Sequence, residues 1–443
     1  MENSRALYDE LKHIVGETGI LPEAQVTDYT FDGYVPKAVV LPASVQEIQE
    51  VLRFASKKAL SVIPAGAGTK LGIGNLPQKV DIVLATTRLN SVVEYEPADL
   101  TVTVEAGIRL ANLQGELAEH RQYLPLDPAY SDRCTIGGIV SANASGSLRL
   151  RHGTARNQVL GLRVVHANGT VVKSGGKVVK NVAGYDLNKL YIGAFGTLGI
   201  VTEVTLKLSP IPPREVMLTA GFENVQNAVN TGLSIVGSQT LPMFVNLSIN
   251  TDLAFGDAAD EVKSALVIGF GGDPETVAWQ LAQCRDIIEQ NGAMGVTIIE
   301  DKSQQQVWAA IREFPAASRD TKKVIAKLNL KRTDVVEFAA QAVAEGSDHG
   351  VQVMALLGSG VLYLAIPVTS DTDFQTLARH LTALRQSTMK ARGNLIVESA
   401  PPELKQHIDV WGPLGDGDSL MQLVKVRFDS SGLLNPGRFI SSI

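Results

Sequence analysis

Residues 64–70 read Pro-Ala-Gly-Ala-Gly-Thr-Lys (PAGAGTK), and this short loop decides between several nucleotide-binding folds. Because glycine has no Cβ, the backbone N–H groups of such a loop can approach a phosphate closely. A P-loop requires GxxxxGK[ST], whereas here Lys70 follows Thr69. A Rossmann fingerprint requires GxGxxG at the start of a helix, and residues 67–74 contain neither feature. The loop therefore predicts either an anion-binding turn between two strands or a tight turn without a ligand.

The flanking sequence predicts a helix and a strand before the loop and a strand after it. Ser44 and Glu47 are spaced as a capping box, and the apolar residues that follow recur on one helical face. Residues 60–63 read as a short strand that runs into the loop, and residues 80–84 read as the next strand. The predicted order is helix, strand, glycine loop, strand.

Further along, residues 135–146 (TIGGIVSANASG) consist almost entirely of small side chains. Such a run lets a flat, bulky ligand lie against the backbone, although a close-packed helix start would have the same composition. Strands are predicted at 92–96, 101–106 and 200–208, with a helix at about 109–120. Asn168-Gly169 predicts a two-residue hairpin turn.

Composition excludes several classes of function. The chain has 443 residues, which favours two or three domains, and its net charge of −6 is not that of a nucleic-acid-binding protein. Two cysteines are too few for an iron–sulfur cluster with four thiolates, and they favour a reducing, cytoplasmic location. No histidines are spaced as metal ligands, and no apolar window is long enough to span a membrane. We expect no metal, no nucleic-acid partner and no membrane span.

The pattern of predicted elements changes after Pro210, Pro212 and Pro213. Strands and amphipathic helices alternate up to about residue 400, which predicts an α+β fold with one antiparallel sheet and helices on one face. We expect three segments: residues 1–213, residues 214–400 as a cap domain, and residues 401–443 returning to the first domain.

In order along the chain, the PAGAGT loop, EPADLTVTVEAG, LPLDP, TIGGIVSANASG, RHGTARNQVLG and GTLGIVTEVTLKL resemble the FAD-binding domain of the vanillyl-alcohol-oxidase (PCMH-type) flavoprotein superfamily. The tail LLNPGRF resembles the glycolate-oxidase/D-lactate-dehydrogenase branch. Residues 175–200, with the run from Lys177 to Asp186 as a particular mark, resemble the FAD-binding E subunit of bacterial glycolate oxidase. The resemblance implies a two-subdomain FAD-binding domain, an α+β cap and an FAD cofactor.

The resemblance also implies the FAD-binding residues. No histidine or cysteine stands in the first loop, where some members attach the flavin, so we expect non-covalent FAD. The expected cofactor-binding residues are Ala65, Gly66, Ala67, Gly68 and Thr69 at the pyrophosphate; Asp127 and Pro128 near the isoalloxazine; Thr135, Gly137, Gly138, Ala142 and Asn143 along the flavin and its phosphates; and Gly199, Ile200 and Val201 near the adenine.

In the metal-using 2-hydroxy-acid dehydrogenases of this branch, the cap carries an arginine after a tryptophan, an HxGDGNxH element and an EHG element. The arginine binds the substrate carboxylate. In the EHG element, the histidine takes the hydroxyl proton and the glutamate helps to hold the metal. Here Trp308 and Arg312 keep the first feature, although a surface arginine is an equal alternative. Neither histidine element occurs: Leu356 and Tyr363 stand at the histidine positions, and Ser399 follows Glu398. The candidate catalytic residues are Arg312, Lys327 and Tyr363.

Three functions stay open on the sequence. The first is a flavin-carrying subunit of a glycolate-oxidase-like complex, partnered by a catalytic D-type flavoprotein and an iron–sulfur F-type subunit, through which the chain could associate with a membrane. The second is a self-sufficient, metal-independent dehydrogenase of a small 2-hydroxy acid, with Tyr363 or His407 as the base; a phenol is a poor base at neutral pH. The third is a scaffold that keeps the fold without redox chemistry.

Overall fold

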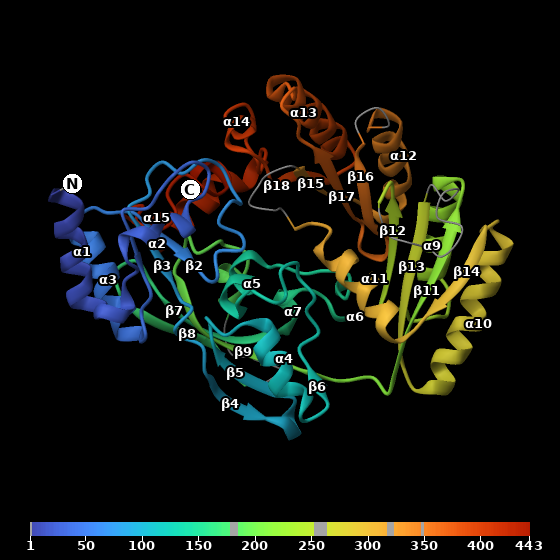
Figure 1. The fold of residues 1–443 in the computed structure, drawn as a ribbon, viewed down its shortest axis with the longest axis horizontal. Helices are drawn as coiled ribbons and strands as arrows, with labels where there is room; N and C mark the ends of the chain where they lie inside the picture. The colour runs from blue at the N-terminus through green and yellow to red at the C-terminus, as the bar shows by residue number, and fades with distance from the viewer. Residues whose placement is uncertain (1, 178–184, 252–263, 317–322, 347–349) are drawn as a thin grey trace.

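The structure is a computed structural model that describes residues 2–177, 185–251, 264–316, 323–346 and 350–443. Figure 1 shows two lobes: the blue-to-green N-terminal part and the red C-terminal end form one, and the yellow-to-orange segments form the other. Most of the Lys177–Asp186 run, residues 178–184, lies outside the described residues.

The glycine loop belongs to a small parallel sheet of order β1-β3-β2, formed by β1 (Ala38–Val40), β2 (Val62–Ala65) and β3 (Ile82–Ala85). Helices α1 (Glu2–Val15) and α3 (Val45–Lys57) pack on it. As predicted, Ser44 caps the N-terminus of α3, because its Oγ accepts the Glu47 N–H at 3.1 Å. Glu47 reaches back to the Ala43 N–H at 2.8 Å. The expected apolar face of α3 is fully buried against the sheet.

A second sheet, antiparallel and of order β4-β5-β9-β7-β8, lies beside the first. It consists of β4 (Val92–Glu96), β5 (Thr101–Glu105), β7 (Val159–Val165), β8 (Val171–Gly175) and β9 (Ile200–Lys207). The predicted hairpin turn joins β7 to β8, with Gly169 at φ +80°. Around this sheet lie the short helices α6 (Arg149–His152), α7 (Ala155–Gln158) and α8 (Asn188–Tyr191), the longer α4 (Leu110–Ala118) and α5 (Ile136–Ala142), and the strand pair β6 (Gln122–Tyr123) and β10 (Ser209–Pro210). The short helix α2 (Glu23–Val26) packs instead on β1 of the first sheet.

The cap is built on an eight-stranded antiparallel sheet of order β14-β11-β13-β12-β16-β17-β15-β18. Its strands are β11 (Arg214–Phe222), β12 (Phe244–Ile249), β13 (Ser264–Gly272), β14 (Gly295–Ile299), β15 (Lys323–Asn329), β16 (Gln352–Leu356), β17 (Val361–Pro367) and β18 (Asn394–Ser399). The helices α9 (Val225–Val236), α10 (Pro274–Gln290), α12 (Val335–Gly346) and α13 (Phe374–Lys390) cover its outer face (Figure 1). The predicted antiparallel sheet is confirmed, but helices are not confined to one face, because α11 (Asp301–Glu313) packs on the other.

The inner face of the cap sheet is turned toward the first lobe and packs against α11 (Asp301–Glu313). After β18 the chain returns to the first lobe through α14 (Pro402–Lys405) and α15 (Asp418–Phe428). There the final segment runs alongside β2: the Val62 N–H donates to the Leu433 carbonyl at 2.9 Å, and the Asn435 N–H donates to the Val62 carbonyl at 3.0 Å. The two lobes therefore share a boundary lined by the inner face of the cap sheet.

Candidate functional site: a glycine-lined cleft and an adjoining cap cleft

The PAGAGTK loop follows β2 directly and lies against the start of α5. A Cβ at Gly66 would stand 2.0 Å from the Thr135 hydroxyl, so only glycine allows these two segments to approach so closely. Gly68 has a φ of +75°, a conformation that side chains disfavour. The loop is therefore a backbone surface held against a second one.

The second backbone surface is the small-residue run. Thr135 begins α5, and its side chain accepts the Gly138 N–H at 3.3 Å. Gly137 is forced to be small, because a Cβ there would lie 2.7 Å from the Ala106 side chain. Both interpretations of this run therefore apply: the helix start is closely packed, and it also forms one wall of a cleft.

That cleft, here called the glycine cleft, has about 1000 Å³ of space between its walls, part of it open to solvent. Among the described residues, its lining includes two cations, Lys70 and Arg438, and no carboxylate. This charge suits a dinucleotide pyrophosphate, and the small side chains leave backbone exposed to it. Thirteen of the expected cofactor residues line it: Ala65, Gly66, Ala67, Gly68, Thr69, Pro128, Thr135, Gly137, Gly138, Ala142, Gly199, Ile200 and Val201.

Asp127 differs from the expectation. It is buried and does not line the glycine cleft; its carboxylate accepts the Gly146 and Leu148 N–H groups, both at 3.1 Å. Burial raises the pKa of Asp127 to about 7, against the lowering effect of these backbone hydrogen bonds. Asp127 thus holds the loop before α6 and lines a separate cleft. Its expected place near the isoalloxazine stays a prediction. Asn143 lines the adjoining cleft described below.

Cys134 lies in the wall of the glycine cleft and was not singled out from the sequence. Burial raises the pKa of its thiol to about 12, so the thiol stays protonated at neutral pH and is a weak nucleophile. Non-covalent attachment of a cofactor stays a prediction, and this thiol is consistent with it.

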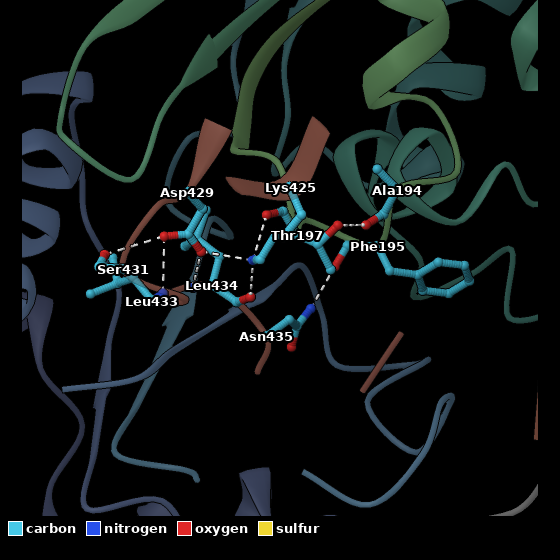
Figure 2. Close-up of polar contacts among 9 residues, drawn as sticks. All are labelled: Ala194, Phe195, Thr197, Lys425, Asp429, Ser431, Leu433, Leu434 and Asn435. Carbon is cyan, nitrogen blue, oxygen red and sulfur yellow. Dashed lines mark hydrogen bonds and ion pairs between the residues drawn. The ribbon is translucent and has the colours of Figure 1, made fainter. Parts of the chain in front are cut away.

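The glycine-rich bend at residues 193–199 is held in place by a buried ion pair (Figure 2). Lys425 Nζ donates to Asp429 Oδ2 at 2.7 Å and to the carbonyl oxygens of Thr197 and Leu434, both at 2.9 Å. Asn435 also donates to the Phe195 carbonyl. Phe195, Thr197 and Asn435 all line the glycine cleft, so the returning tail fixes one of its walls.

Arg438, from the LLNPGRF tail, is another lining residue that the sequence analysis did not single out. Its guanidinium donates to the carbonyls of Leu71 and Ile73, just after the glycine loop. Burial lowers the pKa of Arg438 to about 10, and Asp32 opposes this shift. The guanidinium stays charged at neutral pH, which places a cation in this wall of the cleft.

A second cleft, here called the cap cleft, adjoins the first and has about 1200 Å³ of space between its walls, part of it open to solvent. The two clefts share eight lining residues: Lys70, Ile73, Pro128, Ala129, Ala142, Ala144, Phe195 and Trp411. The far wall of the cap cleft is the inner face of the cap sheet. Lys327 on β15 lies opposite Tyr363 on β17 in the strand register, and its Nζ is 5.5 Å from the centre of the Tyr363 ring. Glu398 falls at a register shift between β15 and β18, a position that favours functional side chains. Its Oε1 is 3.0 Å from Lys327 Nζ.

The charges of these three groups are fixed at neutral pH. Burial opposes the charged form of Glu398, but Lys327 and Lys70 outweigh it and bring the pKa of Glu398 down to about 2. Burial likewise opposes the charge on Lys327, but Glu398 raises its pKa above the usual value. Burial raises the pKa of Tyr363 despite the neighbouring Lys327. At neutral pH the cap cleft therefore holds an ion pair, Lys327–Glu398, in which both groups are charged, and the protonated phenol of Tyr363.

Arg312 is not brought together with Lys327 and Tyr363. It lies on α11 in a different cleft, between α4, β11 and α11, with its Nε 3.2 Å from Glu313 Oε1. In that cleft Trp308 stacks near Phe244, with ring centres 4.7 Å apart. Arg149 lines the cap cleft instead, and neither it nor Lys70 was among the sequence candidates. His407, the alternative base, is exposed on the turn after α14.

Among the residues that the structure describes, no group of three or more histidine, cysteine, aspartate or glutamate side chains converges as metal ligands would. In the same residues, no helix has both the length and the apolar content needed to cross a bilayer.

Comparison with known proteins identifies the family. Residues 36–175 match the FAD binding domain, and residues 211–439 match the C-terminal domain of FAD linked oxidases. The D-2-hydroxyglutarate dehydrogenase of Xanthomonas citri pv. viticola is 30% identical over 425 residues, which cover 92% of this chain and 90% of that protein. The glycolate oxidase subunit GlcD of Bacillus subtilis is 26% identical over 420 residues, covering 92% and 89%.

Solved structures share the fold. p-Cresol methylhydroxylase, solved with substrate bound, superposes with a TM-score of 0.76 at 16% identity and covers 99% of this chain and 97% of its own. Alkyldihydroxyacetonephosphate synthase superposes with a TM-score of 0.74 at 17% identity, covering 97% and 85%. The expected PCMH-type fold is thereby confirmed. With two family models matched along the chain and a cleft whose charge and shape suit a dinucleotide, this protein belongs to the family of FAD-linked oxidases and is an FAD-dependent oxidoreductase.

Proposed function

We propose that this chain is the FAD-carrying subunit of a glycolate-oxidase-like 2-hydroxy-acid dehydrogenase complex. The glycine loop, α5 and the bend at 193–199 hold the cofactor, and residues of the cap sheet line the adjoining cleft. Bound FAD supplies an acceptor for two electrons. The similarity to glycolate oxidase subunits and to D-2-hydroxyglutarate dehydrogenase supports this class of complex.

The observation that carries the proposal is the protonation state of the cap cleft. Oxidation of a 2-hydroxy acid needs a group that takes the hydroxyl proton, and such a group works best with a pKa near neutrality. Among the described lining residues, Glu398 has a pKa of about 2 and is tied to Lys327. The pKa of Tyr363 is raised, and no histidine is among the described lining residues. These residues suit electron transfer better than substrate oxidation.

Subunit assembly needs an exposed apolar surface, and α15 carries one. Leu420, Leu423 and Val426 are 64%, 68% and 60% exposed, while Lys425 on the same helix points inward. Isolated apolar side chains are common on surfaces, but three within two helical turns are typical of an interface. We propose that this face docks on the catalytic D-type flavoprotein, with an iron–sulfur F-type subunit completing the complex.

The test is an anaerobic reduction of the purified, FAD-loaded chain. Glycolate, D-lactate and D-2-hydroxyglutarate are each expected to leave the visible flavin absorbance unchanged, whereas dithionite bleaches it. Adding the partner flavoprotein together with glycolate should then bleach this chain's flavin. Rapid bleaching by a hydroxy acid without a partner would refute the proposal.

The second candidate is a self-sufficient 2-hydroxy-acid dehydrogenase. It is favoured by the charge of the cap cleft, because three cations, Lys70, Arg149 and Lys327, face a single carboxylate, Glu398. An excess of positive charge beside a cofactor cleft suits an anionic substrate. In the anaerobic test, bleaching by one hydroxy acid in the absence of a partner would support this function instead.

A further inference from the structure

Two of the three cations in the cap cleft are already engaged. Lys327 is 3.0 Å from Glu398 Oε1. Lys70 Nζ is 3.8 Å from Glu398 Oε2, and Lys70 also lines the glycine cleft. The Glu398 carboxylate thus lies between two ammonium groups. Both lysines therefore already contact a carboxylate of the protein, and a small ligand would have to compete with Glu398 for them.

Arg149 is different. It lines the cap cleft and does not line the glycine cleft. Its guanidinium also lies near enough to Lys327, Tyr363 and Glu398 to act electrostatically on them. Among the described residues, no hydrogen bond or ion pair joins the Arg149 side chain to the protein. A guanidinium with five donors therefore stands partly buried at this cleft.

The backbone around Arg149 is firmly held. The preceding Leu148 N–H donates to Asp127, and Asn246 of the cap donates to the Ser147 hydroxyl at 2.6 Å. On the other side, the Arg151 guanidinium donates to the Gly271 carbonyl of the cap at 2.7 Å. These contacts tie α6 to both lobes. They hold the start of the Arg149 side chain at the junction, which lowers the entropy cost of ordering it on a ligand.

We propose that Arg149 binds the carboxylate of a small 2-hydroxy or 2-oxo acid in the cap cleft. A guanidinium presents two parallel N–H donors that match a carboxylate, and desolvation in the cleft strengthens the contact. Arg312, the arginine that the sequence favoured, lies in another cleft beside Glu313. The site does not require turnover, so a subunit that only carries FAD can still bind the acid.

Isothermal titration of the FAD-loaded full chain with oxalate tests this assignment. Oxalate is expected to bind saturably, and oxamide, which has the same skeleton without charge, is not. Arg149→Gln should weaken oxalate binding about 10- to 100-fold, the effect of losing a charge-assisted contact. Arg149→Lys should be intermediate, because one ammonium cannot reproduce the fork. The control Arg285→Gln, an exposed residue on the outer helix α10, should bind like the wild type.

Arg312→Gln gives the decisive contrast and should also bind oxalate like the wild type. The assignment is overturned if Arg149→Gln binds oxalate normally with its FAD spectrum intact, if Arg312→Gln loses binding instead, or if the wild type shows no saturable binding at millimolar oxalate. This outcome is separable from the proposed function, which fails only if a hydroxy acid bleaches the flavin without a partner.

Discussion

Replacing Lys425 by methionine should test whether the returning tail holds the cofactor wall. Methionine keeps the apolar stem and removes the ammonium, which makes three contacts of 2.7–2.9 Å (Figure 2). Asp429 would then be a fully buried carboxylate without its cation. Removing one partner of a buried ion pair costs about 3–5 kcal/mol.

The lower end of that range applies here, because Asp429 keeps the N–H groups of Leu433 and Leu434. A loss of about 3 kcal/mol is a large part of a typical stability of about 5–15 kcal/mol. FAD affinity should fall as well, because the carbonyl of Thr197 loses its donor and Thr197 lines the glycine cleft.

Urea unfolding followed by circular dichroism measures the first effect, and FAD titration by fluorescence quenching measures the second. The double variant Lys425→Met/Asp429→Asn should recover part of the stability, since no buried charge is left unpaired and the amide oxygen still accepts a backbone N–H. The reasoning is refuted if Lys425→Met unfolds within about 1 kcal/mol of the wild type, or if the double variant is no more stable than the single one.

Three further changes probe other parts of the molecule. Gly66→Ala places a Cβ 2.0 Å from the Thr135 hydroxyl and should weaken FAD binding about tenfold or more in a fluorescence titration. The control Gly72→Ala, where the Cβ would meet open space, should bind FAD like the wild type. Equal FAD affinities of the two variants would contradict the close approach. Burial raises the pKa of Asp127 to about 7. The native state therefore holds a proton that the unfolded chain has lost, so the stability from this group is complete below about pH 4 and disappears as the pH rises through about 7. Relative to Asp127→Asn, the wild-type unfolding free energy should decline between about pH 5 and pH 8, and parallel curves would count against this. The double variant Leu420→Asp/Leu423→Asp should lose co-purification with the partner flavoprotein and keep its FAD spectrum. The control Gln422→Glu, at another exposed position of α15, should keep both. Undiminished co-purification of the aspartate variant would reject α15 as the interface.

Local sequence was sufficient for the elements that depend on neighbouring residues. Ser44 and Glu47 determine the start of α3, and the spacing of its apolar residues determines the face that it buries. The glycine loop was recognisable because a backbone surface requires residues without side chains, whatever surrounds it. The α+β class and the antiparallel cap sheet could be predicted from hydrophobic periodicity, which also depends only on residues close together in the chain.

Long-range contacts decided the rest. The sequence showed that Trp308 and Arg312 are close along one helix, but only the packing of α11 puts that arginine in a separate cleft. Arg149 reaches the cap cleft because α6 is wedged between the lobes, and Lys425 reaches Thr197 across 228 residues of chain. Asp127 turned out to be a buried acceptor for backbone N–H groups. The residue types available for chemistry can be read along the chain, whereas their meeting points depend on how two lobes and a returning tail pack in three dimensions.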